Sequence, residues 1–343
     1  MLPALSKPQR ELVEMSGSGY RITSEDFDSL YSHWREPESH LQWDCPFVVP
    51  PWLEVWWQAF GSSADLYLRA VRRGDAVLGI APLQIRDGTA SFVGSEDVCD
   101  FLDFVLTPGG EHDFFEALLD DLKHRGITRL NLGPFRPDSE TLSHLVGTAK
   151  QRACEISCAT EDVSLELDLP PTWEEYLGML SGKQRHEVRR KLRRLGEKGD
   201  VNYRTVEGGE AVEEVIDLFL MFFRESREDK RNFLTPKKES FFRSLTRAMA
   251  QDLILKIGIL ELDAKPVAAV MGFHYNDTVY LYNSGYDPQY RTLSTGLISK
   301  ILCTKDSITE GKRKFDFLKG AEEYKYRLGG EEVYLKRCEI ILG

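Results

Sequence analysis

The stretch that most constrains the fold of this chain spans residues 265–325. It contains two predicted strands, a helix and a third strand, in that order, at 265–275, 278–286, 297–311 and 314–320. A polar loop ending in Ser294-Thr295-Gly296 leads into the helix. The first amides of a helix have no internal hydrogen-bond partner and carry partial positive charge. The order therefore predicts a helix N-terminus that binds an anion, for which a pyrophosphate is the usual ligand.

Charge is spread unevenly along the 343 residues, for which two domains are the natural expectation. Residues 1–170 hold 14 Lys and Arg against 28 Asp and Glu, whereas residues 171–343 hold 30 against 27. The dipeptide Pro170-Pro171 marks the predicted boundary between domains 1–170 and 171–343. Because the acidic first part repels polyanions, the sequence argues against DNA and against a large RNA footprint.

The same kinds of element recur in both parts. The first part predicts a hairpin at 65–86 followed by a helix and two more strands, and the second predicts helices followed by three antiparallel strands, a helix and further strands. The recurrence indicates two copies of one unit. The predicted fold class is therefore α/β (α+β), with mixed, mainly antiparallel sheets.

Neither a metal site nor a membrane segment is predicted. The six cysteines lack the paired spacing of a zinc site, so we expect reduced, buried thiols and assign no residue to a metal. The N-terminal residues are too polar for a signal peptide, and the longest apolar run, 215–223, is interrupted by Asp217 and too short to cross a bilayer. We expect a cytoplasmic protein.

A predicted helix at 181–199 is unusually basic, with eight Lys and Arg between residues 183 and 198. Ser181 and Gln184 form a capping box at its start. Lys183, Arg185 and Arg189 are candidates for substrate binding, because so dense a run of cations favours a nearby anion. A solvated helix face is the equally weighted alternative.

Three motifs occur in a characteristic order along the second part. They are Ser181-x-Lys183-x-Arg185 before the basic helix, Gly285-Tyr286-Asp287-Pro288 leading to Leu293-Ser294-Thr295-Gly296, and Phe315-Asp316-Phe317-Leu318-x-Gly320 before Tyr324-Lys325. In this order they resemble the GNAT superfamily of acyltransferases, and in particular its tandem, CelD-type members, which are related to the Fem-type peptidyltransferases. The resemblance covers about residues 20–340, although its distinctive motifs lie after residue 180.

The resemblance implies two tandem GNAT-like units, the first degenerate and the second binding an acyl donor. The donor is usually acyl-CoA, such as acetyl-CoA, which acts as a co-substrate and is not permanently bound; it lies between two splayed strands, here 279–286 and 314–318. The implied donor-binding residues are Tyr286, Arg291, Ser294, Thr295 and Gly296. The loop departs from the family pattern because it contains one glycine, and Fem-type relatives use aminoacyl-tRNA instead.

Acyl transfer requires removal of a proton and stabilisation of an oxyanion. Asp316 is the candidate base, because burial in an apolar strand raises a carboxyl pKa; a hydrogen-bonded partner of a backbone turn is the alternative. Lys325 is a candidate for holding a phosphate or else an exposed surface lysine, and Tyr324 either protonates the leaving thiolate or packs. His274 is a candidate substrate contact, with a satisfied core histidine as the safer interpretation.

The function predicted from these observations is transfer of an acyl group, acetyl above all, to an amine or hydroxyl of a small-molecule or saccharide acceptor. Two alternatives stay open. One is a Fem-like peptidyltransferase that uses aminoacyl-tRNA, with the basic helix contacting the nucleic acid. The other is a non-catalytic binding protein that has kept the fold, since a fold does not fix a function.

Overall fold

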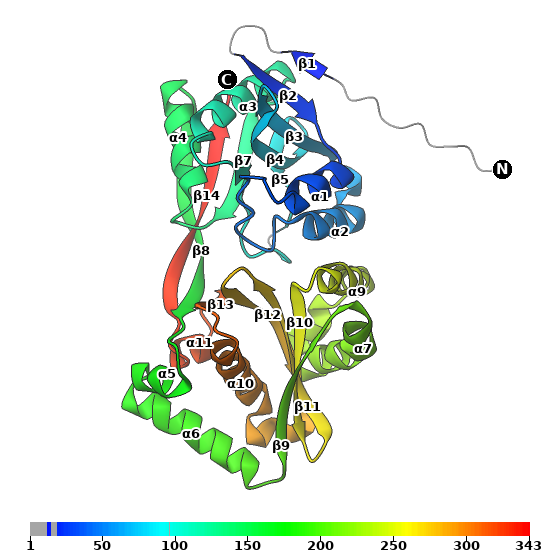
Figure 1. Cartoon of the computed structure of the whole chain (residues 1–343), viewed down its shortest axis with the longest axis vertical. Helices are drawn as coiled ribbons and strands as arrows, with labels where there is room; N and C mark the ends of the chain where they lie inside the picture. The colour runs from blue at the N-terminus through cyan, green and yellow to red at the C-terminus, as the bar shows by residue number, and fades with distance from the viewer. Residues whose placement is uncertain (1–11, 15–18, 96) are drawn as a thin grey trace, which may run out of the picture. The chain divides into compact units, whose positions relative to one another are not determined.

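The computed structural model describes residues 12–14, 19–95 and 97–343 (Figure 1). The chain divides into two compact units. The first unit comprises the described residues up to Glu161 together with Leu335–Gly343, and the second comprises Asp162–Tyr334. Within the described residues, no helix has both the length and the apolar character needed to cross a membrane.

The first unit contains a mainly antiparallel sheet with helices. Its elements are β1 (Leu12–Glu14), β2 (Tyr20–Ser24), α1 (Phe27–Arg35), α2 (Pro50–Phe60), the short 3-10 helix η1 (Gly61–Ser63), β3 (Asp65–Arg73), β4 (Ala76–Arg86), β5 (Thr89–Phe92), β6 (Val105–Leu106), α3 (Glu111–His124), β7 (Arg129–Phe135) and α4 (Glu140–Gln151). The strand order is β1-β2-β3-β4-β5-β7, with β6 beside β4. Trp52 and Trp56 of α2 are buried, so this aromatic helix contributes to the core.

Two strands cross the boundary between the units, namely β8 (Glu155–Asp168) and β14 (Glu331–Ile341). The predicted second domain, 171–343, is therefore wrong at its end, because residues 335–343 belong to the first unit. The physical reason is strand pairing. The later part of β14 pairs antiparallel with β7, with Cys338 opposite Leu132, and this pairing covers the edge of β7.

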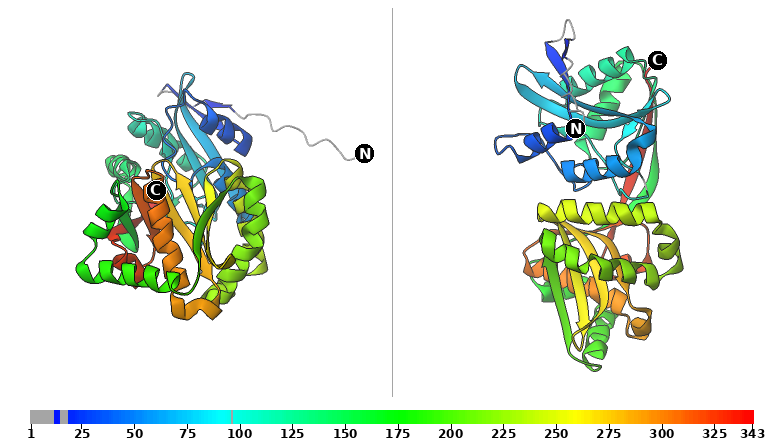
Figure 2. Two further views of the ribbon diagram at one scale, coloured as in Figure 1. Left: turned by 60° about the horizontal axis from the view of Figure 1, so that its bottom comes forward. Right: turned by 90° about the vertical axis from the view of Figure 1, so that its right-hand side faces the viewer.

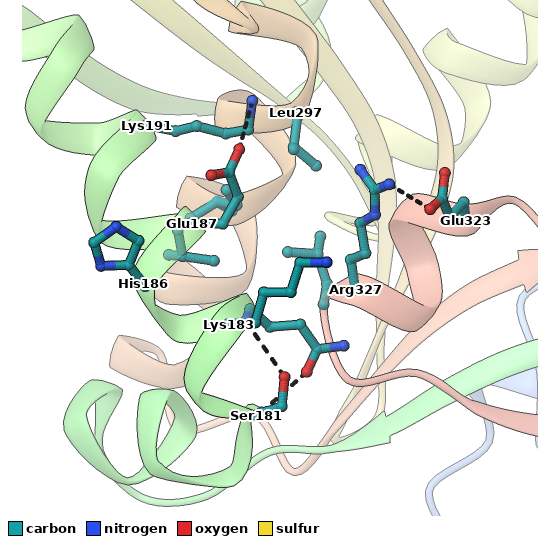
Figure 3. Close-up of a pocket in the computed structure, with 12 residues that line it drawn as sticks. Ser181, Lys183, His186, Glu187, Lys191, Leu297, Glu323 and Arg327 are labelled. Carbon is teal, nitrogen blue, oxygen red and sulfur yellow. Dashed lines mark hydrogen bonds and ion pairs between the residues drawn. The ribbon is translucent and has the colours of Figure 1, made fainter.

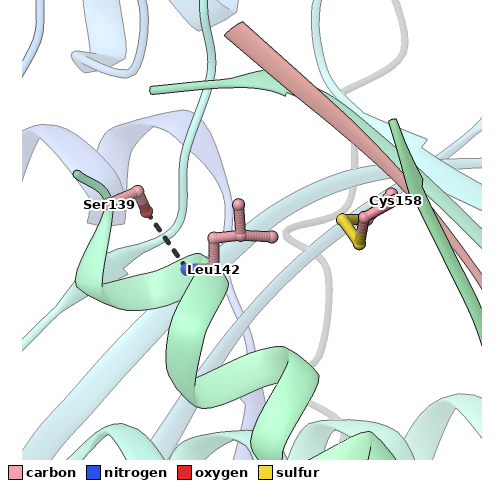
Figure 4. The surroundings of a disulfide bond; sticks show 4 residues. Ser139, Leu142 and Cys158 are labelled. Atoms are coloured by element: carbon pink, nitrogen blue, oxygen red, sulfur yellow. Dashed lines mark hydrogen bonds between the residues drawn. A yellow bond between two sulfur atoms is a disulfide. The ribbon is translucent and has the colours of Figure 1, made fainter. Parts of the chain in front are cut away.

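Cys158 of β8 and Cys338 of β14 form a disulfide (Figure 4), with their Cα atoms 4.2 Å apart although 180 residues separate them in sequence. The prediction that all six cysteines are free thiols is wrong for this pair. The reason is that β8 and β14 are neighbours in the sheet, a long-range pairing that cysteine spacing does not reveal. The other four are free thiols: Cys45, Cys99 and Cys303 are buried and Cys154 is half-buried.

The second unit contains a sheet in the order β8-β13-β12-β11-β10-β9, in which β12 and β13 pair in parallel. Its elements after β8 are α5 (Trp173–Met179), α6 (Gly182–Gly196), β9 (Val201–Glu207), α7 (Gly209–Ser226), α8 (Glu228–Phe233), α9 (Pro236–Gln251), β10 (Leu255–Leu262), β11 (Lys265–Tyr275), β12 (Thr278–Tyr286), the 3-10 helix η2 (Pro288–Leu293), α10 (Thr295–Thr309), β13 (Lys314–Lys319) and α11 (Glu323–Arg327). The predicted sequence of two strands, loop, helix and strand is confirmed.

Helices cover both faces of this sheet (Figures 1 and 2). On one face, Val279 of β12 shares a buried cluster with Ile301 of α10, and α5 and α6 add residues to the same cluster. On the other face, Tyr282 of β12 packs against Phe242 of α9, with ring centroids 5.8 Å apart. The alternation of side chains along β12 thus fixes α10 on the face opposite α7 and α9.

Helix α7 approaches β12 most closely at Gly285, where an added Cβ atom would lie 2.3 Å from the backbone of Phe222 and Phe223. We expect Gly285→Ala to lower the free energy of unfolding by about 3 kcal/mol, because the added methyl group could be accommodated only by moving the backbone of α7 or β12. Urea titration of the full chain measures the change. Gly178→Ala on α5 is the matched control, since no atom lies within 4 Å of its added Cβ. Equal stability of the two variants would contradict the close approach.

Candidate active site

Strands β12 and β13 pair only over their first residues, Thr278–Tyr280 with Lys314–Asp316. Beyond this ladder, β12 continues to Tyr286 and β13 to Lys319. We call the space between residues 281–286 and 317–319 the seam. Carboxyl ends of parallel strands that separate in this way form the usual ligand crevice of an open α/β sheet.

A bulge in β12 lies beside the start of the seam. Met271 of β11 pairs with Asn283 and Gly272 with Leu281, so that Tyr282 is an extra residue on β12. Such a bulge bends its strand and increases the local twist. The bulge is therefore a local cause that helps β12 to turn away from β13.

The N-terminus of α10 lies at the end of the loop that follows β12. Its N-cap, Ser294, has a left-handed backbone with φ 60° and provides no side-chain cap. The Ser294 hydroxyl instead accepts a hydrogen bond from Lys191 Nζ of α6, at 2.8 Å. The adjacent Thr295 is fully buried, and its hydroxyl has no hydrogen-bond partner among the residues that the structure describes. Uncapped amides, an unused hydroxyl and a nearby ammonium group together suit an anion.

Gly296 allows the first turn of α10 to lie against Tyr286, because a Cβ atom there would come within 2.6 Å of Tyr286 Cδ1. Four of the predicted donor-binding residues, Tyr286, Ser294, Thr295 and Gly296, are thus gathered at one place. Arg291 precedes them on η2 with its side chain exposed. The structure therefore brings the predicted loop residues to the end of the seam.

A pocket of about 750 Å³ lies between α6, α10 and α11 (Figure 3). It is lined by Ser181, Lys183, Gln184, His186, Glu187, Val188, Lys191, Leu297, Ile301, Glu323, Arg327 and Leu328. The predicted contact Lys183 and the unpredicted Arg327 both line it, and Arg327 forms an ion pair with Glu323. Leu297 belongs to the first turn of α10, so the pocket adjoins that helix end.

Much of the basic helix α6 is neutralised by its own surroundings. Arg189 pairs with Glu174 at 3.0 Å, and Arg190 makes two hydrogen bonds of 2.8 Å to Glu187. These bonds hold the pKa of Glu187 down at about 2, mainly through Arg190. Arg185 is half-buried and, within the described residues, forms no ion pair. The ion-paired, solvated interpretation therefore fits Arg189, whereas Lys183 and Arg185 keep their charges available.

Asp316 is fully buried on β13, at the vertex where the seam opens. Its Oδ1 accepts hydrogen bonds from the Leu318 amide at 2.7 Å and from the Ser164 hydroxyl at 3.2 Å. Leu318 has a left-handed backbone, with φ 62°, which is strained for a leucine. The contacts match the alternative interpretation of Asp316, a buried carboxylate that stabilises a backbone turn.

Lys325 stabilises the same turn from the opposite side. Its Nζ donates to the carbonyl oxygens of Leu318, at 2.8 Å, Lys319, and Gly320, at 3.0 Å, and forms an ion pair with Glu322 at 2.9 Å. The side chain is only 2% exposed, so the expectation of an exposed surface lysine is wrong. The reason is that an ammonium group can satisfy several carbonyls that a tight turn leaves unpaired.

Tyr324 is half-buried beside the seam, where its ring packs against Phe317 of β13. Burial raises the pKa of its phenol, which keeps the proton on the oxygen. Lys300 of α10 lies over the same ring, with Nζ 5.0 Å from the ring centroid. Lys300 belongs to none of the sequence motifs, although its place between Ile298 and Ile301 in the apolar first half of α10 is a signal that could have pointed to it.

His274 lies away from these residues. Its Nδ1 is 3.1 Å from Oε2 of Glu310, the C-cap of α10. The opposite ends of this helix are about 20 Å apart at 1.5 Å per residue. The His274 contact holds the pKa of Glu310 at about 2, and the imidazole is satisfied by this carboxylate. The structure therefore does not bring His274 to the seam.

Comparison with known proteins identifies the second unit. Residues 182–326 match the family model described as an acetyltransferase (GNAT) domain. This stretch is a GNAT domain. It contains every element that borders the seam, from α6 to α11. A search of curated protein sequences found no match.

Solved structures share the fold of the whole chain at low sequence identity. FemX is similar with a TM-score of 0.61 and 11% identity over 92% of this chain and 96% of its own. The C-terminal domain of a putative lysylphosphatidylglycerol synthetase from Agrobacterium fabrum has a TM-score of 0.57 at 11% identity, covering 92% and 90%. L-PGS from Bacillus licheniformis has 0.51 at 9%, covering 85% and 90%. These similarities confirm the predicted α/β fold, and the family match confirms a GNAT domain in the second unit.

Proposed function

We propose that the GNAT domain transfers an acyl group from acyl-CoA to an amine or hydroxyl of a small-molecule or saccharide acceptor. The observation that carries this proposal is the geometry of the seam, which ends beside the uncapped N-terminus of α10. A strand edge without a strand partner suits the amides of a pantetheine arm, and free helix amides suit a diphosphate.

The residues at the end of the seam fit such a donor. The unpartnered hydroxyl of Thr295 and the amides of the first turn of α10 would meet the diphosphate, with Lys191 beside Ser294 to offset its charge. Arg291 is exposed on η2 and adds a further cation near this end. The glycine at 296 keeps the first turn free of a side chain. The single glycine of the loop is thus compatible with a phosphate site.

The transfer needs few protein groups. The acceptor nitrogen or oxygen loses a proton to water and forms a bond to the thioester carbonyl carbon, the C–S bond breaks, and the leaving thiolate takes a proton. Tyr324, whose raised pKa keeps it protonated, is suited to supply that proton. We assign to Asp316 and Lys325 the role of holding the turn at Leu318, which shapes the wall of the seam.

Aminoacyl-tRNA is the second candidate donor. Lys183 and Arg185, which form no ion pairs in the described structure, support it because unpaired cations near a pocket suit phosphate groups. Binding of charged tRNA that weakens steeply with salt would favour this donor. The ion pairs of Arg189 and Arg190 reduce the number of cations available to a nucleic acid.

Isothermal titration of the full chain with CoA and acetyl-CoA tests the proposal. We expect binding that weakens about tenfold in Arg291→Glu, since the change reverses a charge near the diphosphate. Arg313→Glu is the matched control, because Arg313 is 85% exposed and pairs with Asp277 at the amino ends of β12 and β13, away from the seam. Absence of CoA binding to the unmodified protein would overturn the proposal.

A further inference from the structure

Two lysines place their ammonium groups beside the seam, one against β12 and one against Tyr324 of α11, and we call them the inner lysine pair. Lys230 of α8 donates to the carbonyl of Ser284 on β12, at 2.5 Å. Lys300 of α10 donates to the carbonyl of Gly296, at 2.7 Å, and lies over the ring of Tyr324. Tyr324 in turn contacts Phe317 of β13. The pair therefore contacts β12 on one side of the seam and the β13–α11 segment on the other.

Neither ammonium group of the pair forms an ion pair within the part of the chain that the structure describes. The nearby carboxylates are committed elsewhere, Glu322 to Lys325 at 2.9 Å and Asp229 to Arg227 at 2.9 Å. The other contacts of the pair are aromatic rings, Phe223 for Lys230 and Tyr324 for Lys300. Both lysines are half-buried, and a partly buried ammonium group without a carboxylate favours an anion that comes from outside the chain.

Burial lowers the pKa of both lysines, and Glu322 opposes this shift in each of them. Burial lowers the pKa of Lys300 to about 7, with the charge of Lys230 as a further cause. Burial likewise lowers the pKa of Lys230 to about 8, with Arg227 adding to the effect. A bound anion would reverse these shifts by stabilising both charged forms.

We propose that the inner lysine pair binds a carboxylate carried by the transferred acyl group, so that the donor is a dicarboxylic acyl thioester such as succinyl-CoA. The inference rests on the proposed function, which places the thioester in the seam. The diphosphate would be held by the amides of α10 and by Lys191, which also pairs with Glu187 at 3.3 Å. Ser284 and Tyr324, which the pair contacts, lie instead along the path of the pantetheine arm and the acyl group.

The inference leaves the reaction itself unchanged. The acceptor forms a bond to the thioester carbonyl carbon, the C–S bond breaks and the thiolate is protonated, while the distal carboxylate takes no part in bond making. The inner lysine pair therefore acts on specificity. It gains Coulomb energy with a carboxylate at a half-buried site, whereas a methyl group in the same place would leave both ammonium groups without an anion.

Comparison of succinyl-CoA with butyryl-CoA is the direct test, because the two acyl chains have the same number of carbons and differ in a terminal carboxylate. We expect isothermal titration of the full chain to give at least about tenfold tighter binding of succinyl-CoA, from a charge-assisted hydrogen bond. In Lys300→Met and in Lys230→Gln, we expect the two affinities to fall within about threefold of each other. Lys198→Met, an exposed lysine near the end of α6, is the control and should keep the preference.

The possible outcomes distinguish failure of the carboxylate assignment from failure of the proposed acyl-CoA function. Binding of CoA and of both esters with equal affinity would overturn the inference and leave the proposed function standing. Absence of binding by every CoA compound would overturn the proposed function itself. A third arm titrates free succinate into the CoA complex: lysine-dependent succinate binding without any preference between the esters would assign the carboxylate to the acceptor and overturn the acyl assignment. The comparison on the unmodified protein needs no variant to fold.

Discussion

Replacing Gly296 by aspartate is expected to weaken the binding of CoA about 100-fold, or about 2.7 kcal/mol. The new carboxylate would lie in the first turn of α10. There it would accept hydrogen bonds from the helix amides and repel the diphosphate. Two like charges about 4 Å apart repel by several kcal/mol near a protein surface, which is enough for an effect of this size. Isothermal titration with CoA, at low and moderate salt, measures it.

Gly296→Asn is the matched control, because its side chain has nearly the same shape without the charge. Both variants place a Cβ atom 2.6 Å from the present position of Tyr286 Cδ1, so both force this ring to move. The difference between them therefore isolates the electrostatic part. Equal affinities of the two variants for CoA would show that no anion lies at the start of α10.

Replacing Lys325 by methionine is expected to lower the free energy of unfolding by about 3 kcal/mol. The buried ammonium group donates to the carbonyls of three consecutive residues, and removing it leaves buried acceptors unsatisfied. Its partner Glu322 is 48% exposed and can return to water, so the carbonyls account for most of the loss. Urea unfolding measures the change, with the exposed Lys198→Met as the control.

Asp316 offers a second test of the same turn. In Asp316→Asn, the amide oxygen can still accept from the Leu318 amide, so we expect a smaller loss than in Lys325→Met. The alternative to this structural role is direct action on the substrate. A Lys325→Met protein with unchanged stability and abolished turnover would contradict the structural role assigned here.

The sequence predicts the second unit well where local signals agree. The apolar runs at 265–275 and 278–286 predict β11 and β12, and the capping box at Ser181 and Gln184 starts α6 in the structure as expected. Helix α10 begins at Thr295, slightly before the predicted start at 297, because its N-cap is a left-handed serine with no side-chain cap. Boundaries that depend on backbone geometry of this kind are not visible in residue types.

In the candidate site, too, some features could be predicted from local sequence signals and others depend on backbone geometry and packing. The loop at the start of α10 could be predicted, because the first amides of every helix lack an internal hydrogen-bond partner, whatever the residue types. For Asp316, holding a backbone turn is one of the two predicted alternatives, but nothing in the sequence chooses between them. The role of Lys325 could not be predicted, because the strained turn at Leu318 leaves no pattern in the residue types. The inner lysine pair was missed for a related reason: a single lysine in a helix ordinarily points to water, and only packing showed otherwise.

The route of the last strand has a consequence for how this chain is made. Leu335, Cys338 and Ile340 are fully buried in the first unit, yet they follow Asp162–Tyr334 in the chain and therefore leave the ribosome after those residues. Translation must therefore pass through all of Asp162–Tyr334 before the early-made half receives its closing strand. During that interval the edge of β7 lacks its partner strand β14. The second unit can therefore fold before the sheet of the first unit is complete.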